Sequence, residues 1–183
     1  MKISYKITLF IVLFFCVSSA FSQESLRERG IELYEKGDYT TAIETLQKTV
    51  EADAKDREAH LFLGMAYART DDKKQARKAF NFVDESLGKE LNENYDRKLE
   101  IISKPRVRYT QEARRYNVSG TVILAVEFGK NGQIKSVFPV KELSHGLTES
   151  AIQAAKMIEF EPAIKNGRAV TVIKFIEYGF LVF

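Results

Sequence analysis

Apolar residues at every second position mark a strand in the C-terminal half of the chain, which has 183 residues. Period two with β-branched side chains predicts a strand with one well-buried face. The Asn131-Gly132 pair follows, and a type I′ turn needs a positive φ at both central residues, which Asn and Gly accept. We therefore predict a hairpin whose second strand covers about 133–141. The alternating apolar residues of the first strand are Val122, Leu124, Val126 and Phe128.

A short helix is predicted after this hairpin. Thr148 is the predicted N-cap, and Glu149 falls in the first turn, where the helix dipole favours a negative charge. Pro162 marks the end of the segment, because the residue before a proline avoids the helical region. A second turn at 166–167 then leads into a long final strand over 170–183. The apolar face of the helix comprises Leu147, Ala151, Ala154, Ala155 and Ile158.

The N-terminal half repeats with a period of 34 residues. Gly30 recurs as Gly64, and Ala42 recurs as Ala76. A helix-turn-helix unit of this length is typical of tetratricopeptide repeats, and the two units resemble that family. Two units leave one apolar end uncovered, so we predict a capping helix over 89–102, where apolar residues recur every three or four positions. A further recurring pair is Leu46 and Phe80.

The first helix of each repeat is expected to line a partner-binding groove, as the pattern of the tetratricopeptide family implies. The alternative is that two repeats form only a shallow platform that spaces the C-terminal domain. The residues expected to face the groove are Arg27, Ile31, Tyr34 and Glu35 in the first repeat and Leu61, Met65, Ala68 and Arg69 in the second.

A second family resemblance rests on the order and spacing of residues in the C-terminal part. These residues are Pro105, Tyr109, Ala113, Gly120, Val122, Asn131-Gly132, Gly146-Leu147-Thr148-Glu149, Ala151, Ala154, Phe160-Glu161-Pro162-Ala163, Gly167 and Val170. This part resembles the C-terminal domain of TonB, the periplasmic energy transducer of Gram-negative bacteria. Many members have Tyr-Pro where this chain has Tyr109-Thr110. The resemblance implies a domain of αββαβ order with a three-stranded antiparallel sheet.

The predicted architecture is therefore α+β, in three parts. Residues 1–22 form a signal peptide, residues 23–102 form all-α helical hairpins of tetratricopeptide type with the capping helix, and residues 103–183 form the TonB-like domain. Residues 23–100 carry 14 Lys and Arg against 18 Asp and Glu, whereas residues 101–183 carry 12 against 7. This change of sign supports two modules, and the net charge of +3 argues against a dedicated nucleic-acid binder.

The N-terminal segment has the pattern of a secretory signal. Lys2 and Lys6 flank the start of an apolar core over 7–17, and small residues near Ser22 suit cleavage before Gln23. The alternative is an inner-membrane anchor over 7–21. As a helix, that segment would span about 22 Å at ~1.5 Å per residue, which is short of the ~30 Å hydrocarbon core. We therefore expect an exported, periplasmic protein.

Few residues suit catalysis or metal binding. Cys16 lies in the signal segment, so the mature chain has no thiol. His60 is expected to be a partly buried structural residue of the second repeat. His145 lies beside Ser144, but neighbours in sequence do not face each other and no third group is indicated. We expect no enzyme activity, no cofactor, no metal and no small-molecule substrate.

The TonB resemblance also implies how a partner would bind. Domains of this type pair an extended receptor peptide with their last strand, so that main-chain hydrogen bonds give the affinity. We expect an outer-membrane TonB-dependent receptor or another envelope protein as the partner, with a share in energy transduction for transport. The alternatives are an envelope scaffold with no role in uptake and a homodimer that closes the sheet edge. The residues expected at the peptide site are Val172, Lys174 and Ile176, with Tyr109 and Arg114 nearby.

Overall fold

The computed structural model describes residues 26–83 and 95–181. The first helix covers residues 26–36, and it is followed by α2 (Tyr39–Ala52), α3 (Arg57–Arg69) and α4 (Lys73–Phe80). Asp38, Asp56 and Asp72 cap the last three of these helices, since each side chain accepts the backbone N–H three residues further on, at 2.9 to 3.2 Å.

The two repeats make the same close helix contact at equivalent positions. A Cβ atom on Gly30 would lie 2.7 Å from the side chain of Leu46, and a Cβ atom on Gly64 would lie 2.7 Å from the ring of Phe80. No real Cβ atom tolerates such a distance, so glycine allows the paired helices to touch. Ala42 and Ala76 are both fully buried. The 34-residue period in the sequence is thus a repeat of packing as well as of residue type.

The C-terminal domain is built around a three-stranded antiparallel sheet in the order β3-β2-β7. Its main elements are α6 (Gln111–Arg115), β2 (Gly120–Phe128), β3 (Ile134–Lys141), α7 (Leu147–Lys156) and β7 (Val172–Phe180). The predicted α+β class and αββαβ order are therefore confirmed. Four short strands were not predicted: β1 (Glu100–Ser103), β4 (Glu159–Glu161), β5 (Ala163–Lys165) and β6 (Arg168–Val170).

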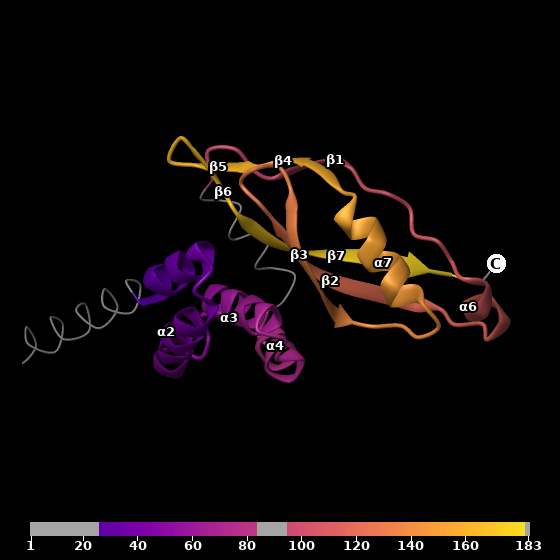
Figure 1. Cartoon of the computed structure of the whole chain (residues 1–183), viewed down its shortest axis with the longest axis horizontal. Helices are drawn as coiled ribbons and strands as arrows, with labels where there is room; N and C mark the ends of the chain where they lie inside the picture. The colour runs from indigo at the N-terminus through magenta and orange to yellow at the C-terminus, as the bar shows by residue number, and fades with distance from the viewer. Residues whose placement is uncertain (1–25, 84–94, 182–183) are drawn as a thin grey trace, which may run out of the picture.

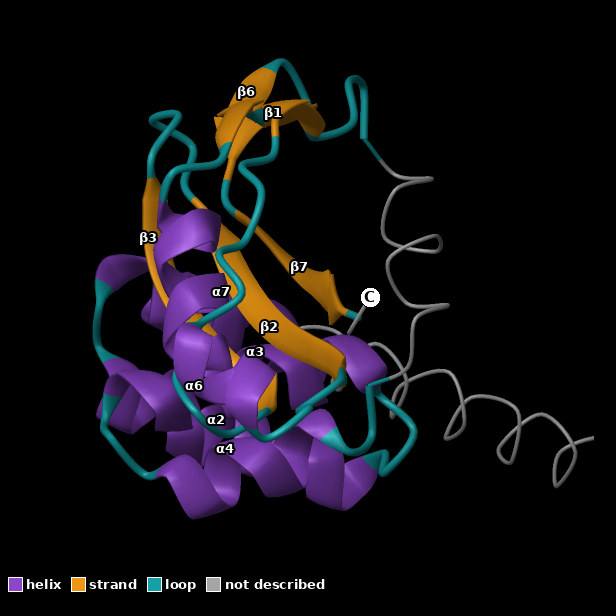
Figure 2. Ribbon diagram, turned by 90° about the vertical axis from the view of Figure 1, so that its right-hand side faces the viewer, coloured by secondary structure: helices purple, strands orange, loops and turns teal. Residues whose placement is uncertain are grey.

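Both faces of this sheet are covered, as Figure 1 shows, with α7 on one side and the helical module on the other. The predicted alternating residues, from Val122 to Phe128, pack with α7 in the first core. Ala125, Phe138 and Ile173 point to the opposite face and share a second core with the repeats. Figure 2 shows the helices α2, α3 and α4 gathered beneath the sheet, while β1 and β6 lie at its far end.

The hairpin between β2 and β3 forms where expected but with a different turn. Gly132 has a φ of 76°, whereas Asn131 is not among the residues with positive φ, so the predicted type I′ turn is wrong. The N–H of Gly132 donates to the carbonyl of Gly129 at 3.0 Å, and the N–H of Gly129 donates to the carbonyl of Gln133 at 2.9 Å. The loop closed by Gly129 and Gln133 is longer than the two residues of a type I′ hairpin turn, and Gly132, but not Asn131, has a positive φ in it. The turn between β5 and β6 does have a positive φ at both Asn166 and Gly167.

The start of α7 also differs from the prediction. The N-cap is Gly146, with a φ of 78° in the left-handed region, and not Thr148. The Thr148 hydroxyl instead accepts from the N–H of Leu143 at 2.9 Å and donates to its carbonyl at 2.8 Å. The Thr148 side chain thus joins the loop at Leu143 to the first turn of α7. The local sequence pattern of a helix cap does not indicate this contact.

The predicted capping helix over 89–102 is wrong in the part that the structure describes. Residues 95–99 are not helical, and Glu100–Ser103 is the strand β1, which pairs with β4. Leu99 belongs to the core beneath α7, and Tyr95 and Ile101 pack against it. Residues 95–102 thus pack with elements of the C-terminal domain and not with the repeats. Residues 89–94 lie outside the described ranges.

The final strand is shorter than predicted. Of the expected 170–183 segment, Val170 ends β6, and β7 runs from Val172 to Phe180. The predicted signal peptide lies outside the described residues. Over the two ranges that the structure does describe, no helix is long and apolar enough to cross a membrane.

Candidate functional site

The helical module is fastened to the back of the sheet by aromatic packing. Phe80, at the end of α4, lies with its ring centroid 5.6 Å from that of Phe138 and 5.9 Å from that of Phe175, the latter edge to face. Leu61 and Met65 of α3 are buried in the same cluster. The sheet thus covers the apolar end of the second repeat, which was expected to need a capping helix.

A buried carboxylate lies at the centre of this junction. Glu127 on β2 is only 3% exposed and accepts the Tyr34 hydroxyl at 2.7 Å and the Arg69 guanidinium at 3.2 Å. Burial, and secondly the adjacent carboxylate of Glu127, raises the pKa of the Tyr34 hydroxyl. Arg69 also lies over the Tyr39 ring, 4.6 Å from its centroid. The first helix, α3 and β2 therefore each contribute one residue to a cluster around the buried carboxylate of Glu127.

Four residues predicted to bind a partner in the repeat groove are thus used inside the molecule. The physical reason is that the back face of the sheet is apolar and fills the groove itself. This expectation of an open groove is therefore corrected over most of its length. The four residues are Tyr34, Leu61, Met65 and Arg69.

One end of the groove remains open as a cavity of about 360 Å³, which we call the interdomain cavity. It is lined by residues 27–35 of the first helix, 58–62 of α3 and 170–173 of the C-terminal domain, with Tyr95 and Lys165 beside them. Of the other four predicted groove residues, Arg27, Ile31 and Glu35 line this cavity, and Ala68 packs against the second core. Arg27 pairs with Asp56 at 3.3 Å and Glu58 at 3.5 Å. The cavity therefore joins the repeats to the beginning of the last strand.

The outer edge of β7 has no strand partner among the described residues, since β7 pairs with β2 alone. All nine of its residues stay in unbroken register with β2. The other edge strand, β3, carries Pro139 and two register shifts, which are devices that protect an edge from further pairing. The edge of β7 is therefore the better template for an added strand.

The direction of the backbone groups on β7 follows from one hydrogen bond. Lys104 Nζ donates to the carbonyl oxygen of Glu177 at 2.7 Å from outside the sheet. Because alternate residues of an antiparallel strand point their N–H and C=O groups to opposite edges, we infer that Ile173, Phe175 and Glu177 point theirs outward. The odd-numbered residues would thus offer the main-chain groups for a partner.

The three β7 residues predicted at the peptide site differ in their surroundings. Val172 is 8% exposed and Ile176 is 5% exposed, and both pack in the core under α7. Val172 also lines one end of the interdomain cavity, whereas Ile176 does not. Of the three predicted residues, Lys174 alone is half-buried. A strand does form here, as predicted. The side chains of Val172 and Ile176 nevertheless lie in the core, because one face of an edge strand is buried in the same way as a face of a central strand.

Tyr109 and Arg114 lie together at the opposite end of β7. The Tyr109 ring packs edge to face with Phe180 at 5.9 Å, and its hydroxyl donates to the carbonyl of Val118. The Arg114 guanidinium lies 5.6 Å from the centroid of the Tyr109 ring. Six residues of strand separate Lys174 from Phe180, or roughly 20 Å at ~3.3 Å per residue. The predicted site residues therefore do not form a single site.

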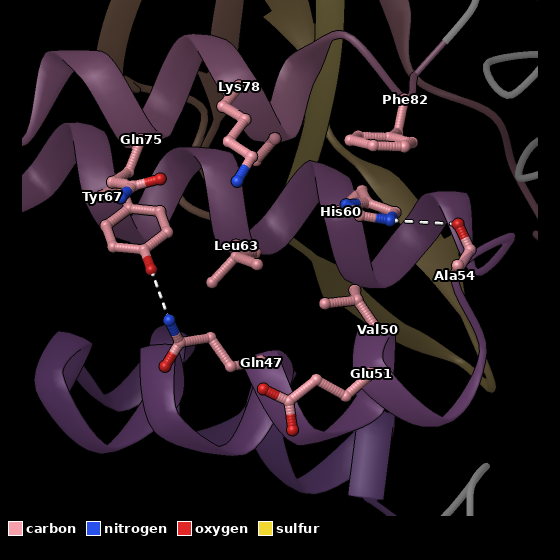
Figure 3. Close-up of a pocket in the computed structure, with 11 residues that line it drawn as sticks. Gln47, Val50, Glu51, Ala54, His60, Leu63, Tyr67, Gln75, Lys78 and Phe82 are labelled. Carbon is pink, nitrogen blue, oxygen red and sulfur yellow. Dashed lines mark hydrogen bonds between the residues drawn. The ribbon is translucent and has the colours of Figure 1, made fainter.

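A second pocket, of about 290 Å³, lies between α2, α3 and α4 (Figure 3). His60 is buried at its edge beneath Phe82, with the rings stacked 4.3 Å apart, and its Nε2 donates to the carbonyl of Ala54 at 3.2 Å. Burial lowers the pKa of His60. Gln47 donates to the hydroxyl of Tyr67 at 2.7 Å across the opening. The predicted structural role of His60 agrees with this placement.

The expectation that Ser144 and His145 do not face each other is wrong. Ser144 Oγ and His145 Nδ1 are 2.7 Å apart, and His145 has a φ of 59°. The His145 ring also packs on Tyr116 at 4.6 Å. Within the described ranges, no carboxylate bonds to this histidine, so the pair lacks the orienting group of a catalytic triad.

Glu127 is the residue of this region that the sequence reading did not single out. Ile123 and Ala125 on the same face are apolar, so the strand carries apolar residues on both faces. A strand of that kind is typically buried on both faces, and a lone carboxylate in it requires a partner. That signal was present in the sequence, although it could not identify Tyr34 and Arg69 as the partners.

Comparison with known proteins supports the same division. Residues 105–180 match the family described as Gram-negative bacterial TonB protein C-terminal, and residues 33–88 match the tetratricopeptide repeat family. The chain is similar to the solution NMR structure of the Pseudomonas aeruginosa TonB CTD, at 17% identity and a TM-score of 0.38, over 45% of this chain and 84% of that chain. No curated protein matches the chain.

The two family matches confirm both resemblances seen in the sequence. Residues 105–180 are thus similar to TonB C-terminal domains, and residues 33–88 are similar to tetratricopeptide repeats. Both kinds of domain indicate a role in protein–protein interaction.

Proposed function

We propose that the protein is a binding protein of the cell envelope, not an enzyme, and that it takes up an extended segment of a partner along the free edge of β7. The observation that carries this proposal is the unpaired outer edge of a nine-residue strand in unbroken register with its neighbour. Such an edge satisfies the main chain of an added strand, while side chains at alternate positions supply specificity.

The proposed partner is an outer-membrane TonB-dependent receptor, which would place the protein in energy-coupled transport. The match of residues 105–180 to the TonB C-terminal family supports this choice and supports a periplasmic or envelope location. Export through a signal peptide cleaved before Gln23 belongs to the same proposal. N-terminal sequencing of the protein from the envelope fraction tests it, since an intact Met1 would indicate an anchor over 7–21 instead.

The partner is to be identified by in-cell cross-linking of the tagged chain followed by mass spectrometry. With the identified partner segment, hydrogen exchange of the β7 amides then tests the binding mode. The amides of Ile173, Phe175 and Glu177 should gain protection on binding, because they point outward, whereas that of Lys174 should already be protected by β2. Unchanged exchange at all three outward amides would rule out strand addition along this edge.

A matched pair of variants tests the same point by mutation. Glu177→Pro removes one outward N–H donor at an exposed position, whereas Glu177→Ala removes only the side chain. We expect the proline variant to weaken partner binding roughly tenfold, which corresponds to about one main-chain hydrogen bond, and the alanine variant to leave it within about twofold. Circular dichroism and thermal melting check that both variants stay folded. Equal binding by both would contradict the proposal, and cross-linking to a second copy alone would favour the homodimer.

A further inference from the structure

The interdomain cavity carries more negative than positive charge. Four glutamates line it, against one arginine and one lysine. Glu28 and Glu35 lie seven residues apart on the exposed face of the first helix, so they stand on one side of it, two turns apart. Glu32 is paired with Lys36 at 2.6 Å, and Glu58 is paired with Arg27. Apart from these two pairs, the rim carboxylates Glu28 and Glu35 remain in the lining against the single positive charge of Lys165.

The wall of the cavity holds a partly buried carboxyl group, that of Glu58. Burial raises the pKa of Glu58, against the opposing effect of Arg27 and Lys165. Glu58 and Glu35 in turn lie near enough to Tyr95 to add to the effect of burial in raising the pKa of its hydroxyl. A carboxyl group in such surroundings gains from a further positive charge, because the charge offsets the cost of its desolvation.

A second, independent observation comes from the C-terminal side of the cavity. Thr171 lines it between β6 and β7 and is only 6% exposed. Its hydroxyl has no hydrogen-bond partner among the described residues. A buried polar atom without a partner costs free energy, so a ligand group that meets this hydroxyl after rotation of the Thr171 side chain would restore a hydrogen bond. Ile31, Leu61 and Val172 supply apolar surface around it for the aliphatic part of a side chain.

We propose that the interdomain cavity is a binding subsite for a basic side chain, arginine or lysine, of the partner segment that lies along β7. The volume of about 360 Å³ lies at the lower end of ligand pockets, which suits one long side chain. The cavity reaches Val172 and Ile173, where β7 begins, so a strand paired with that edge would extend toward it. The repeats would then contribute specificity through Glu28 and Glu35, although most of their groove is filled by the sheet.

This inference rests on the proposed function, but it can be tested without the partner. The probe is Nα-acetyl-arginine methylamide, and its matched control is the citrulline analogue, which has nearly the same shape and no charge. Each is titrated into the full mature chain, and the backbone amides are followed by two-dimensional NMR. We expect the arginine probe to shift the amides of Ile31, Leu61 and Val172 and to bind up to about fivefold more tightly than the citrulline analogue, which is what one exposed charge pair provides.

Charge-neutralising variants identify the carboxylates that act. Glu28→Gln and Glu35→Gln, both exposed and therefore safe for folding, should each weaken arginine binding roughly two- to fivefold. Glu44→Gln makes the same change of charge at an exposed position of α2 outside the cavity and should leave binding unchanged.

Three outcomes would overturn the inference: equal shifts with arginine and citrulline, shifts located away from the cavity, or full binding by the Glu28 and Glu35 variants. If the arginine subsite is disproved but the partner still protects the outward amides of β7, the proposed function remains supported. Conversely, arginine binding in the cavity without protection of β7 would support the subsite and refute strand addition.

Discussion

At the scale of single residues, the junction between the two modules depends on Glu127. Its carboxylate accepts hydrogen bonds from Tyr34 and Arg69, which come from the first helix and from α3. A buried charge that loses a partner keeps its desolvation cost, so the loss of a partner is expected to cost more than an average surface contact. Arg69 is 31% exposed, and its share is therefore reduced by solvent screening.

Tyr34→Phe should lower the free energy of unfolding by about 1–3 kcal/mol, because it removes a hydrogen bond to a buried carboxylate and adds none. Urea denaturation followed by circular dichroism measures this change. Tyr116→Phe is the matched control, since Tyr116 is 61% exposed, and it should have almost no effect. Equal stability of the Tyr34 variant and the natural chain would show that the Glu127 cluster does not hold the junction together.

The raised pKa of Tyr34 also predicts a dependence on pH. In the unfolded chain a tyrosine ionises near pH 10, whereas Tyr34 keeps its proton in the folded chain. Above about pH 10 the unfolded state therefore binds fewer protons than the folded state, and stability falls as pH rises. The pKa values of Tyr67, Tyr95 and Tyr178 are also raised, so the contribution of Tyr34 is measured as the difference between the unmutated chain and the Tyr34→Phe variant. Tyr34→Phe should reduce this alkaline fall by up to about 1.4 kcal/mol per pH unit, measured by urea denaturation between pH 9 and 11.

At the scale of elements, two glycines set how closely the helices of each repeat approach. Gly30 faces Leu46 and Gly64 faces Phe80, at the same relative positions. Helix propensity alone favours alanine over glycine in a helix by about 1 kcal/mol. The presence of glycine at both positions therefore shows that close packing outweighs propensity here.

Gly30→Ala and Gly64→Ala should each destabilise the protein by roughly 1–3 kcal/mol through overpacking. Gly64→Ala should cost the more, because Phe80 also packs against Phe138 and Phe175 and has less freedom to move. Thermal melting measures both changes. Gly179→Ala is the control, since a Cβ atom there meets nothing within 4 Å. A stabilising effect at either helical position would mean that propensity, and not packing, decides.

At the scale of the whole molecule, the repeats and the sheet form one packed unit. The second core contains side chains from both, and Arg77 of α4 forms a further ion pair with Glu142 after β3. Because each module covers apolar surface of the other, neither is expected to keep its native behaviour alone.

A fragment covering residues 95–183 should self-associate, since it exposes Ala125, Phe138, Ile173 and Phe175 on the back of the sheet. The chain from Gln23 to Phe183 should unfold in a single calorimetric transition. Sedimentation velocity of the fragment and differential scanning calorimetry of the chain provide the two measurements. A monomeric fragment with the melting temperature of the full chain would show that the second core contributes little to stability.

The sequence by itself determined the local elements and their class. Period-two alternation over 122–128 indicated the strand and its buried face, because this pattern depends only on neighbours within one element. The 34-residue recurrence of glycine and alanine indicated the repeats, whereas the contacts that these residues make were seen only in the structure. The turn at Asn131-Gly132 and the cap at Thr148 were misassigned, since hydrogen bonds from the surrounding loop decided them.

Only the tertiary structure decided which surface covers the apolar face of the repeats and which covers the back of the sheet. Tyr34, Leu61, Met65 and Arg69 were correctly placed on the inner face of the repeats, but nothing local indicates that this face would meet the chain's own sheet and not a partner. Residues 95–103 form a connection that contains the strand β1 and not a capping helix. Leu99 is buried in the core with α7, and the sheet covers the end of the repeats that the helix was expected to cover. Apolar periodicity shows that a face must be buried, whereas the surface that buries it depends on the path of the whole chain.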